Sequence, residues 1–444
     1  MSIAQGSEPL SHARVLRIAI PIVLSSSTTA LLGLVDTAVV GRMGEAAPIG
    51  AVGVGATVLA TVYWIFGFLR MGTTGLVGQA AGADDQSEVS ALFSRALLIA
   101  GSAGLVIVAL QIPIIWASLA MLPSTQEVES LTRDYLTIRI WSAPAAIAVF
   151  AITGWLIAME RTEGVLVLQL VMNGVNILLD LWFVMGLHWG VEGVAIATLI
   201  AETVGLVLGL WLCRAAFEHP SWRDRVRLFD RAKLTRMALI NFDILIRSAA
   251  ILGIFTSFRF FSANFGEITL AANSILIQFI MLAAFALDGF AYAAEALIAK
   301  AVGRKDRYAL HEAVWRTSLW GVVAAILMTV GFAICGGAII DLMATSQEVR
   351  SDARIYLIWA IIAPMLAIGA FMLDGIFIGA TRGPDLRNMM IVSLVVYLIC
   401  VAALVPPFGN HGLWAAMSIS LLVRALTLGA RYPALVRSVS AEQG

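Results

Sequence analysis

Residues 143–162 read APAAIAVFAITGWLIAMERT, and this stretch carries no charged residue before Glu160. A transmembrane helix needs about 20 predominantly apolar residues. Twelve segments of the chain are long and apolar enough: 18–41, 50–80, 92–117, 136–158, 165–187, 192–213, 238–264, 269–299, 315–341, 355–380, 388–407 and 412–432. Strands of a membrane barrel would instead be short and would alternate in polarity about every second residue. The sequence therefore predicts an all-α integral membrane protein with twelve transmembrane helices.

The composition indicates the same class. Hydrophobic residues make up 60% of the 444 residues and charged residues 13%, whereas a soluble domain carries about 25% charged residues. Lipid must therefore solvate much of the surface. The formal net charge is zero, so no general attraction to nucleic acid is expected. The first apolar segment is longer than the roughly 7–15-residue core of a signal peptide and contains Asp36, which argues against a cleavable signal.

The basic residues are distributed unevenly between the predicted loops. If both termini are cytoplasmic, the cytoplasmic side holds 20 of the 29 Lys and Arg residues, and the opposite side holds five. Short loops rich in Lys and Arg remain on the cytoplasmic side of a membrane. We therefore expect a multi-pass protein of the inner (cytoplasmic) membrane with both termini in the cytoplasm.

The chain also repeats itself. Residues 363–383, APMLAIGAFMLDGIFIGATRG, resemble residues 143–162 at an offset of about 221, and the same offset takes Gly82 to Gly303. Each copy has six spans, so both copies share one orientation and form a parallel repeat related by a pseudo-twofold axis along the membrane normal. Such repeats are typical of alternating-access transporters. We expect a six-helix lobe over 1–213, a basic cytoplasmic linker over 214–236 and a second six-helix lobe over 237–444.

Polar residues inside the first six spans form one candidate site. An aspartate at the centre of a spanning helix costs about 2.5–3.5 kcal/mol, so those that persist usually face a partner or a cavity. Asp36 in span 1 and Asp180 in span 5 fall at similar depths. Asn173 and Asn176 share a helix face with Asp180 because they are seven and four residues before it. Thr198 in span 6 lies at a compatible depth.

This cluster has two possible coupling ions. Burial in a medium of low dielectric favours a neutral carboxyl group, so two nearby carboxyls could take up a proton on one side and release it on the other. The oxygens of Asp36, Asp180 and Asn176 could instead hold Na⁺. A third interpretation is a hydrogen-bonded network that only locks spans 1, 5 and 6 together, and Asn173 and Thr198 suit that role equally well.

Other charged or polar residues also lie within the predicted spans. We expect Glu202 in span 6 to neutralise Arg70 in span 2. The second half carries Asp243, Arg247, Gln278, Asp288, Glu295 and Asp374. Asp243 and Arg247 are four residues apart, close enough on a helix for a local salt bridge, and we assign them a structural or gating role. Asp374, with Asp288 and Gln278, belongs to a possible second cation site or an ion-pair gate.

No pattern indicates an enzyme. The chain has no phosphate-binding loop, so nothing suggests that ATP drives transport. The five histidines and three cysteines are scattered without the spacing of metal ligands. We therefore expect no enzyme activity, no cofactor and no metal other than a coupling ion.

Four motifs now make the sequence recognisable: IPIVLSSSTTALLGLVDTAVVGRMGE (20–45), NGVNILLDLWFVMGLHWGVEGVAIATLIAE (173–202), DGFAYAAEALIAKAVGRKD (288–306) and LDGIFIGATRGPDLRN (373–388). Together and in this order, they resemble the multidrug and toxic compound extrusion (MATE) family, in particular its DinF-like branch. The resemblance covers nearly the whole chain. It implies two six-helix lobes arranged as a V around a central cavity, and secondary active efflux of organic, often cationic compounds in exchange for H⁺ or Na⁺.

The resemblance also assigns roles to residues. The family's span 1 aspartate matches Asp36, its span 5 asparagine and aspartate match Asn176 and Asp180, and its span 6 threonine matches Thr198. Other members place a cation site in the second lobe with acids on spans 7 and 10. Asp374 matches the span 10 position.

The sequence thus favours an H⁺-coupled antiporter for small amphipathic molecules that works in the lipid bilayer as a monomer. One alternative is a flippase for a lipid-linked sugar from the same superfamily, which would need a cationic cavity for pyrophosphate. A membrane scaffold without transport is the other alternative.

Overall fold

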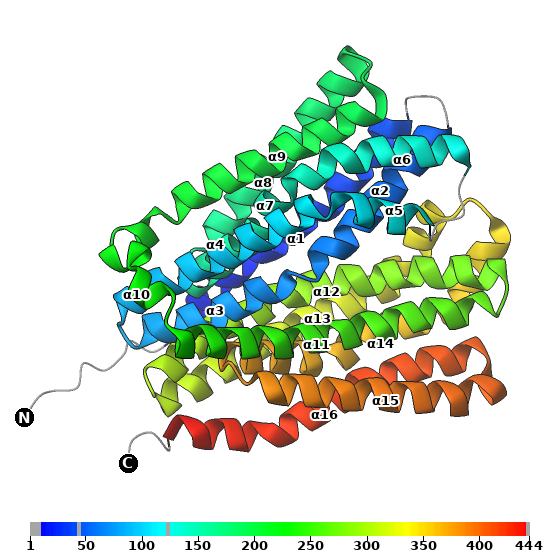
Figure 1. The fold of residues 1–444 in the computed structure, drawn as a ribbon. Coiled ribbons are helices and arrows are strands. Elements are labelled where there is room, and N and C mark those ends of the chain that lie inside the picture. Colours follow the sequence, from blue (N-terminus) through cyan, green and yellow to red (C-terminus); the bar gives the residue numbers. More distant parts are fainter. Residues whose placement is uncertain (1–9, 42–45, 121–124, 441–444) are drawn as a thin grey trace, which may run out of the picture. The chain divides into compact units, whose positions relative to one another are not determined.

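The structure is a computed structural model that describes residues 10–41, 46–120 and 125–440. The side chains of 29–38 and of residues 40, 46 and 440 also lie outside this description. Helices make up nearly all of the described chain, and no strand occurs in it (Figure 1). Eleven segments of the described part are long and apolar enough to cross a membrane. In addition, α1 (His12–Gly41) covers the first predicted span.

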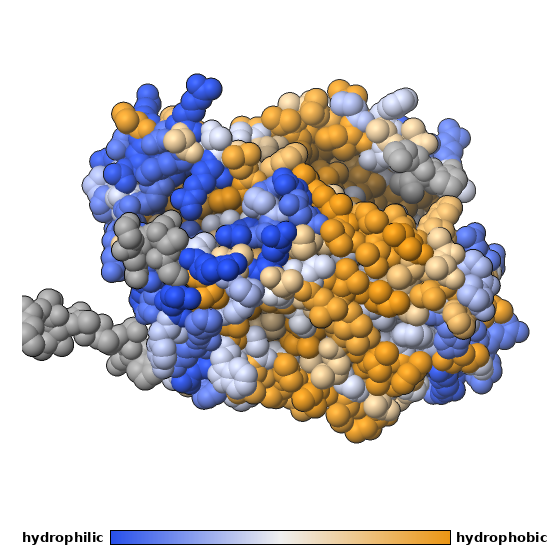
Figure 2. Space-filling view, turned by 90° about the horizontal axis from the view of Figure 1, so that it is seen from below, coloured by the Kyte–Doolittle hydropathy of each residue, from blue (hydrophilic) through white to orange (hydrophobic). Residues whose placement is uncertain are grey.

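The helices present an apolar surface suited to lipid. Figure 2 shows hydrophobic side chains over much of the visible face, with hydrophilic side chains gathered near the helix ends. Large apolar side chains that are at least 72% exposed occur in both halves of the chain: Ile112, Ile334, Leu342, Leu426 and Val226. A water-soluble monomer rarely exposes so many large apolar groups. The chain is therefore an all-helical membrane protein, as the composition predicts.

The chain divides into two compact units. The N unit is Leu24–Thr235, and the C unit combines the described residues of Met1–Val23 with those of Arg236–Gly444. The first half of α1 thus belongs to the C unit, although it precedes the N unit in the sequence. The expected linker, residues 214–236, belongs to the N unit except for its last residue.

The N unit is built from broken helices. Its elements after α1 are α2 (Ala46–Trp64), α3 (Gly67–Gly82), α4 (Gln86–Ala109), α5 (Gln111–Ala120), α6 (Gln126–Arg139), α7 (Ala143–Ala158), α8 (Thr162–Asp180) and α9 (Gly190–Leu212). The predicted span 92–117 divides between α4 and α5. Pro113 explains this break, because it has no N–H to donate to the carbonyl of Ala109. A 3₁₀ turn at Ile140–Ser142 connects α6 to α7 within the predicted span 136–158.

The C unit contains longer, continuous helices. They are α11 (Arg231–Ala263), which begins in the N unit, α12 (Glu267–Gly303), α13 (Arg307–Met343), α14 (Gln347–Gly379), α15 (Gly383–Phe408) and α16 (Asn410–Ser440). Helices α12 and α13 have 37 residues each, or about 55 Å at 1.5 Å per residue. A bilayer core is about 30 Å thick, so these helices extend beyond it. Helix α12 packs along both α13 and α14.

The predicted repeat is visible in the backbone. Left-handed residues with φ between +53° and +59° occur in three pairs separated by 221 residues: Asp84 and Lys305, Glu160 and Thr381, and His188 and Gly409. A left-handed residue just after a helix is a common way to end it. The two units therefore end equivalent helices at equivalent positions, each with a residue of positive φ.

Helix packing repeats at the same offset. A Cβ atom on Gly154 of α7 would lie 2.5 Å from the carbonyl oxygen of Arg70 on α3. A Cβ atom on Gly375 of α14 would lie 2.4 Å from the carbonyl oxygen of Ala291 on α12. The two glycines are 221 residues apart in the sequence, and so are the two residues whose carbonyls they face. Small residues allow helix backbones in membranes to approach this closely, so the repeat extends to tertiary packing.

Candidate functional site

The polar face of α8 lies inside the N unit. Asn173, Asn176 and Asp180 are 8%, 1% and 0% exposed, respectively. Their spacing of three and four residues places them one above the other on a single helix face. The structure thus brings together on a buried face three of the residues that the sequence selected.

Two hydrogen bonds connect this face to neighbouring helices. The amide Nδ2 of Asn176 donates to Thr198 Oγ1 on α9 at 3.2 Å, and that hydroxyl donates to the carbonyl of Val194 at 3.0 Å. The amide Nδ2 of Asn173 donates to Thr28 Oγ1 on α1 at 3.2 Å. Helices α1, α8 and α9 therefore share one polar network. Thr28 was not selected from the sequence, although the hydroxyl-rich run SSSTT within a predicted span was a signal for it.

The amide of Asn176 is incompletely satisfied. Its Nδ2 is bonded to Thr198, but its Oδ1 is buried and accepts no hydrogen bond from the described residues. Leaving a buried acceptor unsatisfied costs about 1–3 kcal/mol. Such an atom is well suited to receive a cation or the proton of a neighbouring acid.

Asp180 occupies an unusual position in the backbone. It is the last residue of α8, and a π-helical turn, Leu181–Gly186, follows it directly. Such wide turns are rare and frequently occur at functional sites. The turn begins at the fully buried carboxylate, one helical turn after Asn176, so backbone irregularity and polar groups coincide here.

The second predicted carboxylate is not placed. Asp36 lies within α1, but its side chain is outside the part of the chain that the structure describes. The site described here therefore consists of Asp180, Asn176, Asn173 and Thr198.

Glu202 forms an ion pair different from the predicted one. Its carboxylate accepts hydrogen bonds from Arg139 at 2.8 and 3.1 Å, and Arg139 also donates to Ser142 at 2.6 Å. The predicted Glu202–Arg70 pair is therefore wrong. Helix α6, which carries Arg139, packs on α9, whereas the helix of Arg70, α3, packs on α4 and α7.

The C unit contains a buried carboxylate between two guanidinium groups. Arg424 Nε on α16 donates to Asp374 Oδ1 at 3.0 Å, and its Nη2 pairs with Oδ2. Arg247 Nη2 on α11 also pairs with Asp374 Oδ2. The Asp374 side chain is 6% exposed and each arginine side chain is 9% exposed. This triad ties α11, α14 and α16 together within the hydrophobic interior.

Asp243 and Arg247 do not form the predicted local salt bridge. Asp243 Oδ1 instead accepts a hydrogen bond from Arg387 on α15 at 2.6 Å. Its other oxygen lies beside Gly383 at the start of α15, where a Cβ would approach to 2.7 Å. Asp243 and Arg247 each pair with a residue on another helix, Arg387 on α15 and Asp374 on α14. Their spacing within one helix did not predict these partners.

The two remaining candidates lie on α12. Asp288 is half-buried. Gln278 is exposed and lines a groove of about 200 Å³ with Arg259, Ser262 and Asn273. No group of three His, Cys, Asp or Glu residues with the geometry of a metal site occurs among the described residues.

Comparison with known proteins identifies the family. The MatE family model matches this chain in two segments, residues 21–182 and 244–404. This chain belongs to the MATE family of transporters. The two matched segments begin 223 residues apart, in agreement with the repeat seen in the backbone.

Individual relatives agree with this assignment. The chain is 37% identical over 415 residues to DNA damage-inducible protein F of Escherichia coli (strain K12), covering 93% of this chain and 90% of that protein. It is 26% identical to the probable multidrug resistance protein NorM of Rhizobium meliloti (strain 1021), covering 99% and 96%. A crystal structure of a Vibrio cholerae MATE transporter superposes with a TM-score of 0.86 at 18% identity, covering 96% and 97%. The resemblance seen in the sequence motifs is thus confirmed.

Proposed function

We propose that this MATE transporter is a cation-coupled antiporter that exports organic, often cationic and amphipathic compounds in exchange for H⁺, with Na⁺ as the alternative coupling ion. The observation that carries this proposal is the buried face of α8. Asp180 is fully buried beside Asn176, and the Oδ1 of Asn176 accepts no hydrogen bond from the described residues. A buried acid beside an open acceptor can exchange a bound cation for another occupant.

The proposed cycle depends on two conformational states of the transporter, one favoured by the substrate and the other by the proton. With Asp180 and Asp36 ionised, the transporter accepts a cationic substrate from the cytoplasm. Protonation from outside removes the negative charge, which weakens substrate binding and favours release. A ligand shifts a conformational equilibrium only by its difference in affinity for the two states, so proton and substrate must favour different states. Asn176, Thr198 and Asn173 position the acid by connecting α8 to α9 and α1.

We assign the second-lobe acids to structure or gating. Both oxygens of Asp374 contact guanidinium groups, and Asp243 is paired with Arg387. A carboxylate engaged by two arginines is a poor ligand for Na⁺. We further propose that the protein acts as a monomer in the inner membrane with both termini cytoplasmic, as the distribution of Lys and Arg favours.

The test uses purified protein reconstituted in liposomes, with a pH gradient or a Na⁺ gradient imposed separately. Movement of a fluorescent lipophilic cation is measured for wild type, Asp36→Asn and Asp180→Asn. The matched control is Asp134→Asn, an exposed acid on α6. We expect the pH gradient to drive transport in wild type and in the control, and the two site variants to fall to the level of empty liposomes.

Other outcomes identify which part of the proposal fails. Transport driven only by the Na⁺ gradient would retain the site and change the coupling ion. If neither gradient moves a cation and Asp180→Asn behaves like wild type, efflux is refuted. A lipid-linked sugar flippase or a scaffold would then be the better explanation.

A further inference from the structure

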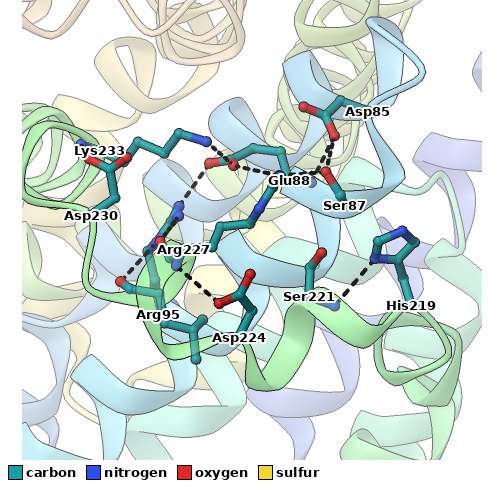
Figure 3. A network of polar contacts seen from close by, with 11 residues as sticks. Asp85, Ser87, Glu88, Arg95, His219, Ser221, Asp224, Arg227, Asp230 and Lys233 are labelled. Atoms are coloured by element: carbon teal, nitrogen blue, oxygen red, sulfur yellow. Dashed lines mark hydrogen bonds and ion pairs between the residues drawn. The ribbon is translucent and has the colours of Figure 1, made fainter.

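Residues 214–235 connect the last helix of the N unit to the C unit, but they are folded rather than extended. They contain two 3₁₀ turns, Arg214–Phe217 and Pro220–Arg223, and the short helix α10 (Arg225–Leu228). Figure 3 shows this segment against the start of α4. We call residues 214–230 the linker cap.

Polar contacts attach the linker cap to α4. The fully buried guanidinium of Arg95 donates to the backbone carbonyls of Leu228 at 3.2 Å and Arg227 at 2.7 Å (Figure 3). Arg95 also pairs with Glu88 at 2.8 Å, and Glu88 in turn pairs with Lys233 just beyond the cap. Because the Arg95 side chain is shielded from solvent, its two hydrogen bonds fix the backbone of the cap.

Aromatic rings hold the other end of the cap. Trp155 of α7 contacts Phe93 of α4 with 5.7 Å between ring centroids. Phe93 contacts Phe217 at 5.6 Å, and Phe217 contacts Trp222 at 5.5 Å in an edge-to-face arrangement. This chain of rings continues the core of the N unit into the linker cap, which is therefore packed as part of that unit.

The outer surface of the cap combines apolar and cationic side chains. Val226 is 86% exposed, Phe229 65% and Trp222 37%. Three exposed arginines lie close to them in the sequence: Arg223 and Arg225 within the cap, with the exposed acid Asp224 between them, and Arg231 directly after it. Arg223 lies over the ring of Trp222, 6.0 Å from its centroid, while the ion pairs with Glu88 are made by Arg227 and Lys233 instead. We call Trp222, Val226, Phe229 and the three exposed arginines the cap face.

The cap face cannot lie far from the membrane. The linker cap lies between the spans Gly190–Leu212 and Arg231–Ala263, and the last residue of the cap face, Arg231, is the first residue of the second span. At the end of the first span, Arg214 lies over the exposed ring of Trp211, 4.8 Å from its centroid. Aromatic rings and basic residues at the ends of spans are typical of the level of the lipid headgroups.

We propose that the cap face binds the anionic phospholipid surface of the membrane in which the protein resides. Phe229, Val226 and Trp222 would enter the boundary between headgroups and acyl chains, while the arginines contact lipid phosphates. Exposed apolar groups are costly in water, and together with exposed arginines they match a negatively charged membrane interface. Lipid binding at this face does not depend on transport, and it would fix the N unit to one leaflet.

The test places a fluorescent probe on the cap face. Val226→Cys is introduced together with Cys335→Ser and Cys400→Ser, because the remaining Cys213 is buried. The cysteine is labelled with an environment-sensitive dye, and the whole transporter is placed in nanodiscs of phosphatidylcholine with or without phosphatidylglycerol. Emission wavelength is recorded, together with quenching by nitroxide-labelled lipid and by aqueous iodide.

If the cap face binds anionic lipid, phosphatidylglycerol shifts the emission to the blue and increases quenching by nitroxide lipid. Replacing Arg223, Arg225 and Arg231 by Gln should then reduce the ratio of embedded to exposed probe by about fivefold per arginine. Arg437→Gln, an exposed arginine on α16, is the matched control and should have no effect.

Two results would overturn the proposal. Equal iodide quenching with and without phosphatidylglycerol would show that the cap face remains in water. A blue-shifted probe that neither quencher reaches would show that protein, rather than lipid, covers it. Equal melting temperatures of the arginine variants in detergent would confirm that the cap itself remains folded.

Discussion

The Asp374 triad makes the strongest quantitative prediction. Asp374→Asn removes the charge that neutralises two arginines, each with a side chain only 9% exposed. Removing one partner of a buried ion pair typically costs about 3–5 kcal/mol, because the remaining charge is left without compensation. For a unit of this size, 1 kcal/mol corresponds to roughly 2–4 °C in melting temperature. We therefore expect the variant to melt about 6–20 °C below wild type.

The measurement is a thermal melt of detergent-solubilised protein, followed by loss of the monodisperse peak. Asp341→Asn provides a matched control. Asp341 also pairs with an arginine, Arg354, at 2.7 Å, but these two side chains are 42% and 45% exposed. Exposed pairs contribute about 0–1 kcal/mol, so the control should melt within a few degrees of wild type.

A double variant tests whether the loss of stability in Asp374→Asn comes from the uncompensated arginine charges. Arg424→Gln combined with Asp374→Asn removes one of the two uncompensated arginines, so the double variant should lose less than the sum of the two single variants. If Asp374→Asn melts no lower than Asp341→Asn, the triad does not stabilise the C unit and our account of its energetics is refuted.

Three further predictions concern packing, access and pH. Gly375→Val should abolish the monodisperse folded peak, because its side chain would clash with a backbone carbonyl of α12, whereas Gly331→Val, with no neighbouring atom within 4 Å, should fold normally. Cys213 should not react with a membrane-permeant maleimide until the protein unfolds, since it is buried against the carbonyl of Ile152; rapid labelling of the folded protein would contradict the packing at the end of α9. Hydrogen bonds from Ser87 and from the backbone amide of Glu88, with nearby Arg227 and Lys233, hold the pKa of Asp85 below its usual value. Its stabilising effect should therefore be complete above about pH 4 and be lost as the pH falls further. Asp85→Asn keeps a good helix N-cap but should remove this pH dependence from the melting temperature.

Most of the fold could be predicted because its determinants are local or periodic. Long apolar runs predict spans wherever they occur, and the match between residues 143–162 and 363–383 predicts the repeat. The breaks within spans were not predicted. The division between α4 and α5 depends on Pro113, whose effect is local but was masked by the uniformly apolar run around it.

The candidate site was predictable only within single helices. The spacing of Asn173, Asn176 and Asp180 places them on one face, and the structure shows that face buried. The ion pairs were not predictable, because the partners lie far apart in the sequence. Glu202 and Arg139 are separated by 63 residues, and only the packing of α6 on α9 brings them together.

The linker cap shows a second limit of prediction from the sequence. Its seven basic residues over 214–236 indicated only a charged connection. The structure buries one side of this segment against Arg95 and Phe93, which lie more than 100 residues earlier. Composition predicts the charge of such a segment, but its fold depends on residues that become neighbours only after the helices pack.

The central claim, that Asp180 exchanges a coupling proton for a cationic substrate, can be tested directly by proton release. Purified transporter in weakly buffered detergent solution is mixed with a lipophilic cation, and a pH indicator records the protons displaced. We predict release by wild type and by Asp134→Asn, and none by Asp180→Asn even though that protein remains folded. Substrate binding by wild type without proton release, or unchanged release by Asp180→Asn, would contradict proton coupling at this site.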